Sequence, residues 1–235
     1  ATRGNVGIPR VLNMYENYPF WYTFFTDLKF RVVLSARSSK KIYEKGIESI
    51  PSESVCYPAK LVHGHIENLI ERGINFIFYP SVVYERQEFS DAGNHYNCPV
   101  VGSYPEVIRN NVDHLEEKNI NYKNPFISLN NPKTLFKVLK DSLSEFNITD
   151  KELHHAIDKA YEELARSRED IREQGRLALE YMHKNHKHGI VLAGRPYHVD
   201  PEINHGIADL ITGEGFVVLT EDSVANMNNE ETNLR

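Results

Sequence analysis

The residues best placed for chemistry lie around Cys56, which directly precedes a predicted helix that begins near Pro58. Free amide groups and the positive end of the helix dipole lower the pKa of a thiol at this position, and thiolate is the form that binds metals or attacks electrophiles. His63, about two helical turns further on, is predicted nearer the polar face of this helix than His65, and Glu53 in the preceding loop is a candidate acid or base. A buried and inert structural cysteine is the competing interpretation of Cys56.

Ser81 and Cys98 are the other candidates for a site with Cys56. Ser81 comes just after a predicted strand, at the end where open α/β sheets place their ligands. Cys98 ends the long polar loop 85–97 and precedes residues 99–103, a predicted strand, so it reaches the same edge only if the loop returns across the sheet. Two cysteines 42 residues apart are not in themselves a metal motif. A cavity lined by two thiolates and one hydroxyl is therefore a hypothesis.

Gly194 and Arg195 form a second candidate site, for an anionic cofactor. They follow a predicted strand and precede a helix predicted to open at Pro201, so backbone amides and a guanidinium are available to hold an anion. The segment lacks the glycine spacing of dinucleotide-binding and Walker loops. A tight turn with an interface arginine is the alternative interpretation.

Alternating strands and helices in the first half of the chain predict an α/β protein with a mainly parallel, Rossmann-like sheet. The predicted strands are residues 6–14, 30–34, 74–79 and 99–103, and the predicted helices are 20–28, 58–72 and one opening at Pro105. Gly73 is placed to end the second helix.

The second half begins with a capping box at Thr149 and Glu152, which opens a charged segment that stays helix-compatible to about Asn185. A helix of roughly 50 Å is too long for one small domain and predicts a connector. Residues 188–235 repeat the strand, helix, strand pattern of the chain start. The predicted organisation is a Rossmann-like domain with a cysteine pocket (1–146), a long helical connector (147–187) and a partial second Rossmann-like lobe (188–235).

Composition excludes several classes of function. The 235 residues are 40% hydrophobic and 26% charged, as in globular proteins that bury a core. A net charge of -6 provides no basic surface for nucleic acid, and no run approaches the roughly 18 to 20 apolar residues of a membrane span. No signal peptide is predicted, and two cysteines are too few for a disulfide framework. We therefore expect a cytoplasmic protein with reduced thiols.

Five segments together resemble one known domain. They are Gly7–Glu16, Pro51–Lys60, Phe78–Glu85, Asn94–Pro99 and Gly194–His198. The resemblance, which covers nearly the whole chain, is to the uncharacterised domain of CoA-substrate-specific enzyme activases, relatives of the 2-hydroxyglutaryl-CoA dehydratase activator. In that family the domain follows ATPase modules in a longer polypeptide of anaerobic bacteria, so we expect the chain to be a piece of such a protein.

The resemblance also implies a cofactor and partners. The domain is similar to subunits of 2-hydroxyacyl-CoA dehydratases and benzoyl-CoA reductases, which hold iron-sulfur clusters on cysteines between Rossmann-like lobes. It implies Cys56 and Cys98 as cluster ligands, with His63 or Glu53 as proton donors if a hydroxyl group leaves at the metal. Ser81 stands where the related motif is expected to have a cysteine, and serine is a rarer and harder ligand for iron than thiolate. ATPase activator domains and dehydratase-like subunits are the implied partners.

Two main functions remain open from the sequence, and a nucleotide- or CoA-binding domain that uses the turn at Gly194 is a third. One is an electron-transfer or dehydratase-like module that receives a low-potential electron driven by ATP hydrolysis elsewhere in the full protein. The other is a non-catalytic scaffold or regulatory domain that docks partner domains and keeps its cysteines inert. The aromatic residues between Tyr15 and Tyr22 are compatible with a docking surface and equally with core packing.

Overall fold

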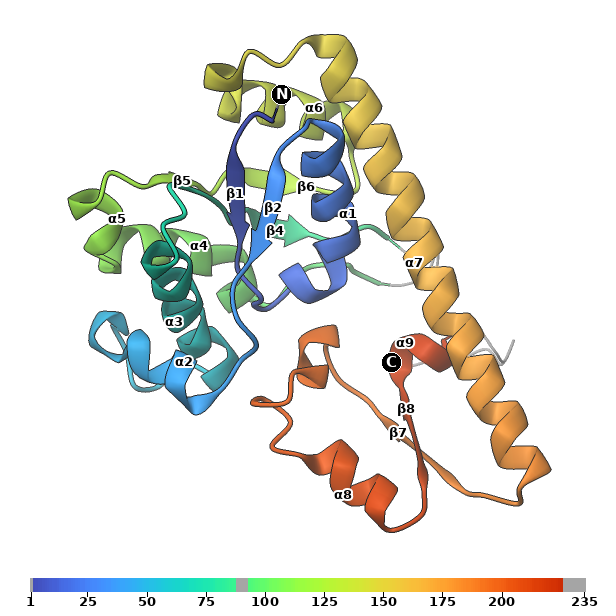
Figure 1. Cartoon of the computed structure of the whole chain (residues 1–235). Coiled ribbons are helices and arrows are strands. Elements are labelled where there is room, and N and C mark those ends of the chain that lie inside the picture. Colours follow the sequence, from blue (N-terminus) through green and yellow to red (C-terminus); the bar gives the residue numbers. More distant parts are fainter. Residues whose placement is uncertain (1, 88–92, 226–235) are drawn as a thin grey trace. The chain divides into compact units, whose positions relative to one another are not determined.

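The computed structural model describes residues 2–87 and 93–225 of the chain. The chain divides into two compact units, Ala1–Glu163 and Leu164–Arg235. The first unit is built around a parallel sheet covered by helices, and the second contains a smaller parallel pair of strands with its own helices. The predicted α/β class with a Rossmann-like parallel sheet is confirmed (Figure 1).

The central sheet of the first unit has four parallel strands in the order β2-β1-β3-β5. These strands are β1 (Asn5–Ile8), β2 (Arg31–Leu34), β3 (Phe76–Phe78) and β5 (Asn121–Lys123). A separate parallel pair is formed by β4 (Ser81–Tyr84) and β6 (Phe126–Ser128). The chain moves outward from β1 in both directions, so the boundary between β1 and β3 is the place where such sheets present ligand sites at their carboxyl ends.

Helices lie between the parallel strands of the central sheet in the chain order, as connections between parallel strands require. They are α1 (Met14–Asp27), α2 (Lys40–Lys45), the short 3-10 helix η1 (Ile47–Ser49), α3 (Tyr57–Glu71), α4 (Pro99–Asn111), α5 (His114–Glu117), α6 (Pro132–Ser142) and the 3-10 helix η2 (Ser144–Phe146). Trp21 and Phe25 of α1 belong to the core, since both are fully buried and their rings lie 4.8 and 5.0 Å from the ring of Phe78, whereas Tyr22 is exposed.

Two predicted strand assignments are wrong in this unit. The first strand ends at Ile8 and not at Met14, because Pro9 lacks an N–H for the ladder and Leu12 adopts a left-handed conformation (φ 42°) before α1 begins. Residues 99–103 form the start of α4 and not a strand. The pair Val100-Val101 favours a strand by propensity, but Pro99 in the first helical turn and an apolar face at helical spacing decide for a helix.

The long helix α7 (Asp150–Lys184) has the predicted start and length. Its capping box is present, since the Thr149 amide donates to Glu152 Oε2 at 2.9 Å and the Glu152 amide donates to Thr149 Oγ1 at 3.3 Å. The stop signal in α3 is also confirmed, because Gly73 follows that helix with φ 74°.

In the second unit, β7 (Gly189–Leu192) pairs in parallel with β8 (Val217–Thr220). Between them lie the 3-10 helix η3 (Pro196–Val199) and α8 (Ile207–Gly213), and the short α9 (Glu221–Val224) follows. The helix predicted to open at Pro201 is wrong. Residues 201–206 form turns, and α8 begins only after Gly206, whose φ of 74° suits glycine.

Candidate functional site

Both cysteines lie directly before helices at the carboxyl side of the central sheet. Cys56 is the N-cap residue of α3 and Cys98 is the N-cap residue of α4, and each is followed by a proline in the first helical turn. Both thiols are free and exposed. The prediction that Cys98 begins a strand is therefore wrong. Cys98 has the same local setting as Cys56, with free amides and the positive end of a helix next to the sulfur.

The helices that follow the two cysteines, α3 and α4, are neighbours in the first unit. They pack against each other (Figure 1), and the His63 ring of α3 is hydrogen-bonded to the Tyr104 hydroxyl of α4 at 3.0 Å. His63 lies seven residues after Cys56, and Tyr104 lies six after Cys98. At a rise of about 1.5 Å per residue, each cysteine lies about 10 Å before this contact along its own helix.

His63 is the centre of a buried polar chain and not a residue of the polar face, so that prediction is wrong. Its side chain is fully buried between α3, η1 and α4. The Ser49 hydroxyl donates to the Gly46 carbonyl at 3.0 Å, so it accepts from Nδ1–H of His63 at 2.8 Å, which leaves Nε2 to accept from the Tyr104 hydroxyl. Burial lowers the pKa of His63 from 6.5 to about 4, so the ring is neutral near pH 7.

The Tyr104 hydroxyl links His63 to α4, the helix that Cys98 precedes. Burial, together with the nearby charge of Cys56, raises the pKa of Tyr104 to about 12. The pKa of Tyr79 is raised well above 10, mainly by burial and in addition by the nearby hydroxyl of Tyr104. Both phenols are therefore neutral at physiological pH, and the Tyr104 hydroxyl is hydrogen-bonded to His63.

Ser81 lies at the start of β4, fully buried. Its amide donates to the Pro125 carbonyl at 2.9 Å, whereas its hydroxyl has no hydrogen-bond partner among the described residues. The hydroxyl of Tyr79, two residues earlier, is also buried and has no hydrogen-bond partner among the described residues. Burial thus separates Ser81 from solvent, whereas both cysteine thiols are open to it.

Glu85, just after β4, binds three side-chain amides. Its carboxylate accepts from Asn17 Nδ2 at 3.1 Å, from Asn97 Nδ2 at 2.7 Å and from Asn13 Nδ2 at 3.4 Å. Asn13 and Asn17 are fully buried at the start of α1. The carboxylate therefore takes the position beside a helix N-terminus where an open α/β sheet accepts an anionic ligand.

Replacing Glu85 with glutamine is expected to lower the free energy of unfolding by about 2 kcal/mol, because three amide donors lose a charged acceptor and one now faces another NH₂ group. Urea unfolding of Glu85→Gln measures the loss. Glu116→Gln removes an exposed carboxylate on α5 and is the matched control, with an expected change of a few tenths of a kcal/mol. Equal losses in the two variants would contradict the assigned role of Glu85.

The remaining predicted site residues lie in other places. Glu53 is exposed in the loop before α3, where its backbone carbonyl accepts from Lys60 Nζ at 2.7 Å. Gly194 and Arg195 belong to the second unit, between β7 and η3. The Arg195 amide donates to His198 Nδ1 at 3.2 Å, and a Cβ on Gly194 would lie 2.4 Å from that nitrogen. The imidazole of His198 thus occupies the space next to this turn.

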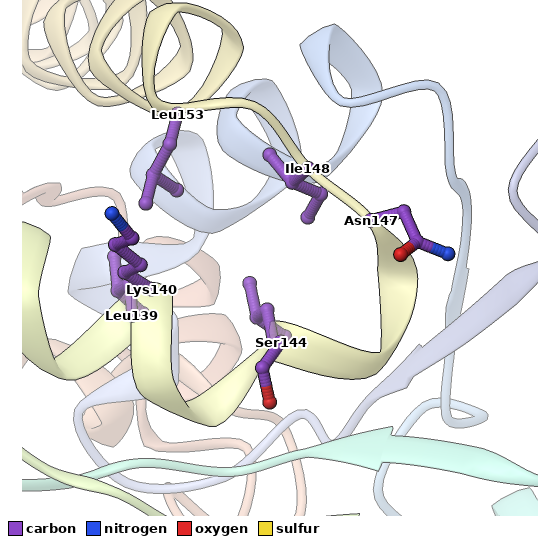
Figure 2. Close-up of a pocket in the computed structure, with 7 residues that line it drawn as sticks. Leu139, Lys140, Ser144, Asn147, Ile148 and Leu153 are labelled. Atoms are coloured by element: carbon purple, nitrogen blue, oxygen red, sulfur yellow. The ribbon is translucent and has the colours of Figure 1, made fainter.

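A surface pocket of about 270 Å³ lies between α6, η2 and the start of α7 (Figure 2). Its apolar lining includes Leu139, Ile148 and Leu153, and its rim carries Lys140, which pairs with Asp150 at 2.8 Å. None of the predicted site residues lines it. The lining of the pocket is mainly apolar and its lysine is paired. We therefore assign the candidate site to the helix ends that carry the cysteines.

The donor set around the cysteines is too small for a metal centre within one chain. Within residues 2–87 and 93–225, no three His, Cys, Asp or Glu side chains come close enough together to hold a metal ion. Cys56 and Cys98 supply two thiolates, and the one further predicted donor, Ser81, is buried. A four-ligand iron-sulfur cluster therefore does not fit the residues of a single copy.

Tyr104 and the amides around Glu85 are the parts of the site that the sequence reasoning missed. A signal for the amides exists, because Asn13 and Asn17 are four residues apart and share one helix face. The strand predicted through Met14 concealed it. Tyr104 has no comparable signal, since its partner His63 lies 41 residues away.

The profile of one protein family, described as the CoA enzyme activase uncharacterised domain, matches residues 5–224. The chain belongs to this family. The resemblance predicted from the five sequence segments is confirmed, and membership associates the chain with CoA-enzyme activase systems and their components. No curated protein and no solved structure matched the chain. Among the described residues, the helices are all too short or too polar to cross a membrane.

Proposed function

We propose that this activase domain is an electron-transfer module in which Cys56 and Cys98 ligate an iron-sulfur cluster. The observation that carries the proposal is the equivalent setting of the two exposed thiols, each at the N-cap of one of two helices that contact each other. Thiolate is the form of cysteine that binds iron, and the free backbone amides of a helix N-terminus are hydrogen-bond donors for sulfur. When bound, such a cluster would accept and pass on single electrons.

The surroundings suit a centre that must exchange electrons with another protein. Exposed thiols place a bound cluster at the surface, and solvent exposure together with hydrogen bonds to sulfur tunes the reduction potential. The ATPase activator domains of the same or a partner chain are the proposed electron source, and dehydratase-like subunits are the proposed acceptors. A cytoplasmic location completes the proposal, because reduced thiols are maintained there.

The proposal is tested by anaerobic reconstitution with ferrous iron and sulfide, followed by iron and sulfide analysis and an absorption spectrum. We expect bound iron and sulfide with absorption at about 400 nm, as is general for iron-sulfur proteins. Cys56→Ala and Cys98→Ala are each expected to lose at least ten-fold of the bound iron, whereas Ser54→Ala, an exposed change two residues from Cys56, keeps it. A wild-type protein that stays colourless after reconstitution, and so has bound no cluster, would contradict the proposal.

The alternative function is a docking scaffold whose cysteines hold no metal. It is favoured by the absence, among the described residues, of three metal-binding side chains in one place. Alkylation with iodoacetamide separates the two functions, because both thiols are exposed. A scaffold predicts fast alkylation before and after reconstitution, whereas cluster ligands are protected after reconstitution and react again once a chelator removes the iron.

A further inference from the structure

Arg10 lies two residues after β1, and the end of β2 fixes its side chain in place. Its backbone amide donates to the Ser35 hydroxyl at 2.8 Å, and its Nε donates to the Ser35 carbonyl oxygen at 3.0 Å. Ser35 directly follows β2, and its own amide donates to the Ile8 carbonyl at 3.2 Å. These bonds hold the guanidinium at the carboxyl ends of β1 and β2, the edge at which open α/β sheets bind their ligands.

The turn after β2 is held in turn by side chains of α3. The Ser35 hydroxyl is hydrogen-bonded to His65 Nδ1 at 2.8 Å, and His65 Nε2 is hydrogen-bonded to the Ser38 hydroxyl at 3.0 Å. Asn68, one turn further along α3, accepts from the Ala36 amide at 2.8 Å. His65 and Ser35 are buried. The support of the guanidinium is therefore a buried network.

The outer end of the Arg10 side chain is open. Among the residues that the structure describes, its two terminal nitrogens have no partner. Arg3, a half-buried arginine of the same unit, is paired with Glu152 at 2.7 Å. Glu85 does not take this role for Arg10, since its carboxylate is bound by three side-chain amides. Arginine stays charged at physiological pH, so this half-buried guanidinium is available for an anion from outside the chain.

Tyr18 supplies a further donor beside Arg10. It is half-buried in the second turn of α1, and its hydroxyl has no partner in the described part of the chain. Burial raises the pKa of Tyr18 and the charge of Arg10 opposes the rise, so the phenol is protonated at neutral pH and lies near the guanidinium. α1 begins four residues after Arg10, and the positive end of its dipole adds to the attraction for an anion.

We propose that Arg10 and Tyr18 bind the oxyanion of a small molecule, a carboxylate or a phosphate, at the carboxyl end of β1. The two terminal nitrogens of a guanidinium match two oxygens of either group, and the phenol donates to one of them. Neither cysteine takes part. The site is therefore independent of the proposed cluster, and either proposal can fail without the other.

The experiment is isothermal titration calorimetry of the 235-residue chain at low ionic strength, with inorganic phosphate and acetate as separate probes. We expect saturable binding that Arg10→Gln weakens about ten-fold or more and Tyr18→Phe about three-fold, because each removes hydrogen bonds to a charged group. Arg37→Gln is the matched control. It removes the same charge from an exposed position in the turn after β2, and a change within about two-fold is expected. Tighter binding of phosphate than of acetate identifies a phosphate site, and the reverse identifies a carboxylate site.

Urea unfolding with and without phosphate or acetate distinguishes binding from a purely structural role of Arg10. A bound anion raises the free energy of unfolding of the wild type and of Arg37→Gln, but not that of Arg10→Gln. An equal rise in Arg10→Gln would show that Arg10 only supports the fold and would overturn the proposal. Equal losses of affinity in Arg10→Gln and Arg37→Gln, or a wild type that binds neither anion, would also overturn it.

Discussion

Replacing Gly64 with alanine is expected to destabilise the first unit by roughly 3 kcal/mol, the upper range for overpacking. Gly64 lies in the middle of α3, where α2 crosses so closely that an added Cβ would lie 1.7 Å from the carbonyl oxygen of Ile42. That neighbour is backbone and cannot turn aside. Gly46 makes the reciprocal contact, since a Cβ there would lie 2.2 Å from the amide nitrogen of Gly64.

The measurement is the free energy of unfolding of Gly64→Ala in urea, compared with Gly213→Ala. Gly213 ends α8, and a Cβ on it would meet nothing within 4 Å. Alanine generally stabilises a helix by up to about 1 kcal/mol relative to glycine, so the control variant is expected to gain slightly. A similar small gain in Gly64→Ala would show that α2 and α3 do not pack this closely. Loss of the contact would also displace Ser49 from His63.

Acidification is expected to destabilise the protein through His63 in the interval between pH 6.5 and about pH 4. The pKa of the buried ring is about 4, against 6.5 for the unperturbed group, so the unfolded chain binds a proton in this interval that the folded chain does not. Stability is therefore lost as pH falls through the window and is fully present above it. After allowance for partial solvent screening, the loss from this group is roughly 2 kcal/mol by pH 4.

His63→Gln isolates this effect, because glutamine cannot be protonated and keeps a hydrogen-bonding amide near Tyr104. The variant is expected to have a smaller difference in unfolding free energy between pH 7 and pH 4.5 than the wild type. His183→Gln, at an exposed position in α7, is the matched control and should leave the difference unchanged. If His63→Gln and His183→Gln retain the same pH dependence as the wild type, the ring of His63 is not buried in its neutral form.

Features that depend on local chemistry could be predicted from the sequence alone. The capping box at Thr149, the glycine stop at Gly73 and the placement of Cys56 before α3 follow from side chains within a few residues of one another. The α/β class also follows from the chain pattern, because strand and helix periodicities differ. Such interactions depend on residues within one short segment, so they can be recognised without knowledge of the tertiary structure.

Contacts between residues far apart in the sequence became known only from the three-dimensional packing. Cys98 has a strand-like neighbourhood in sequence, yet it is the N-cap of α4, a helix that packs on β4 and α3. His63 reads as a polar-face residue until η1 and α4 bury it against Ser49 and Tyr104. These contacts span 14 and 41 residues, and the free energy that selects them comes from burial of surfaces that no single segment contains.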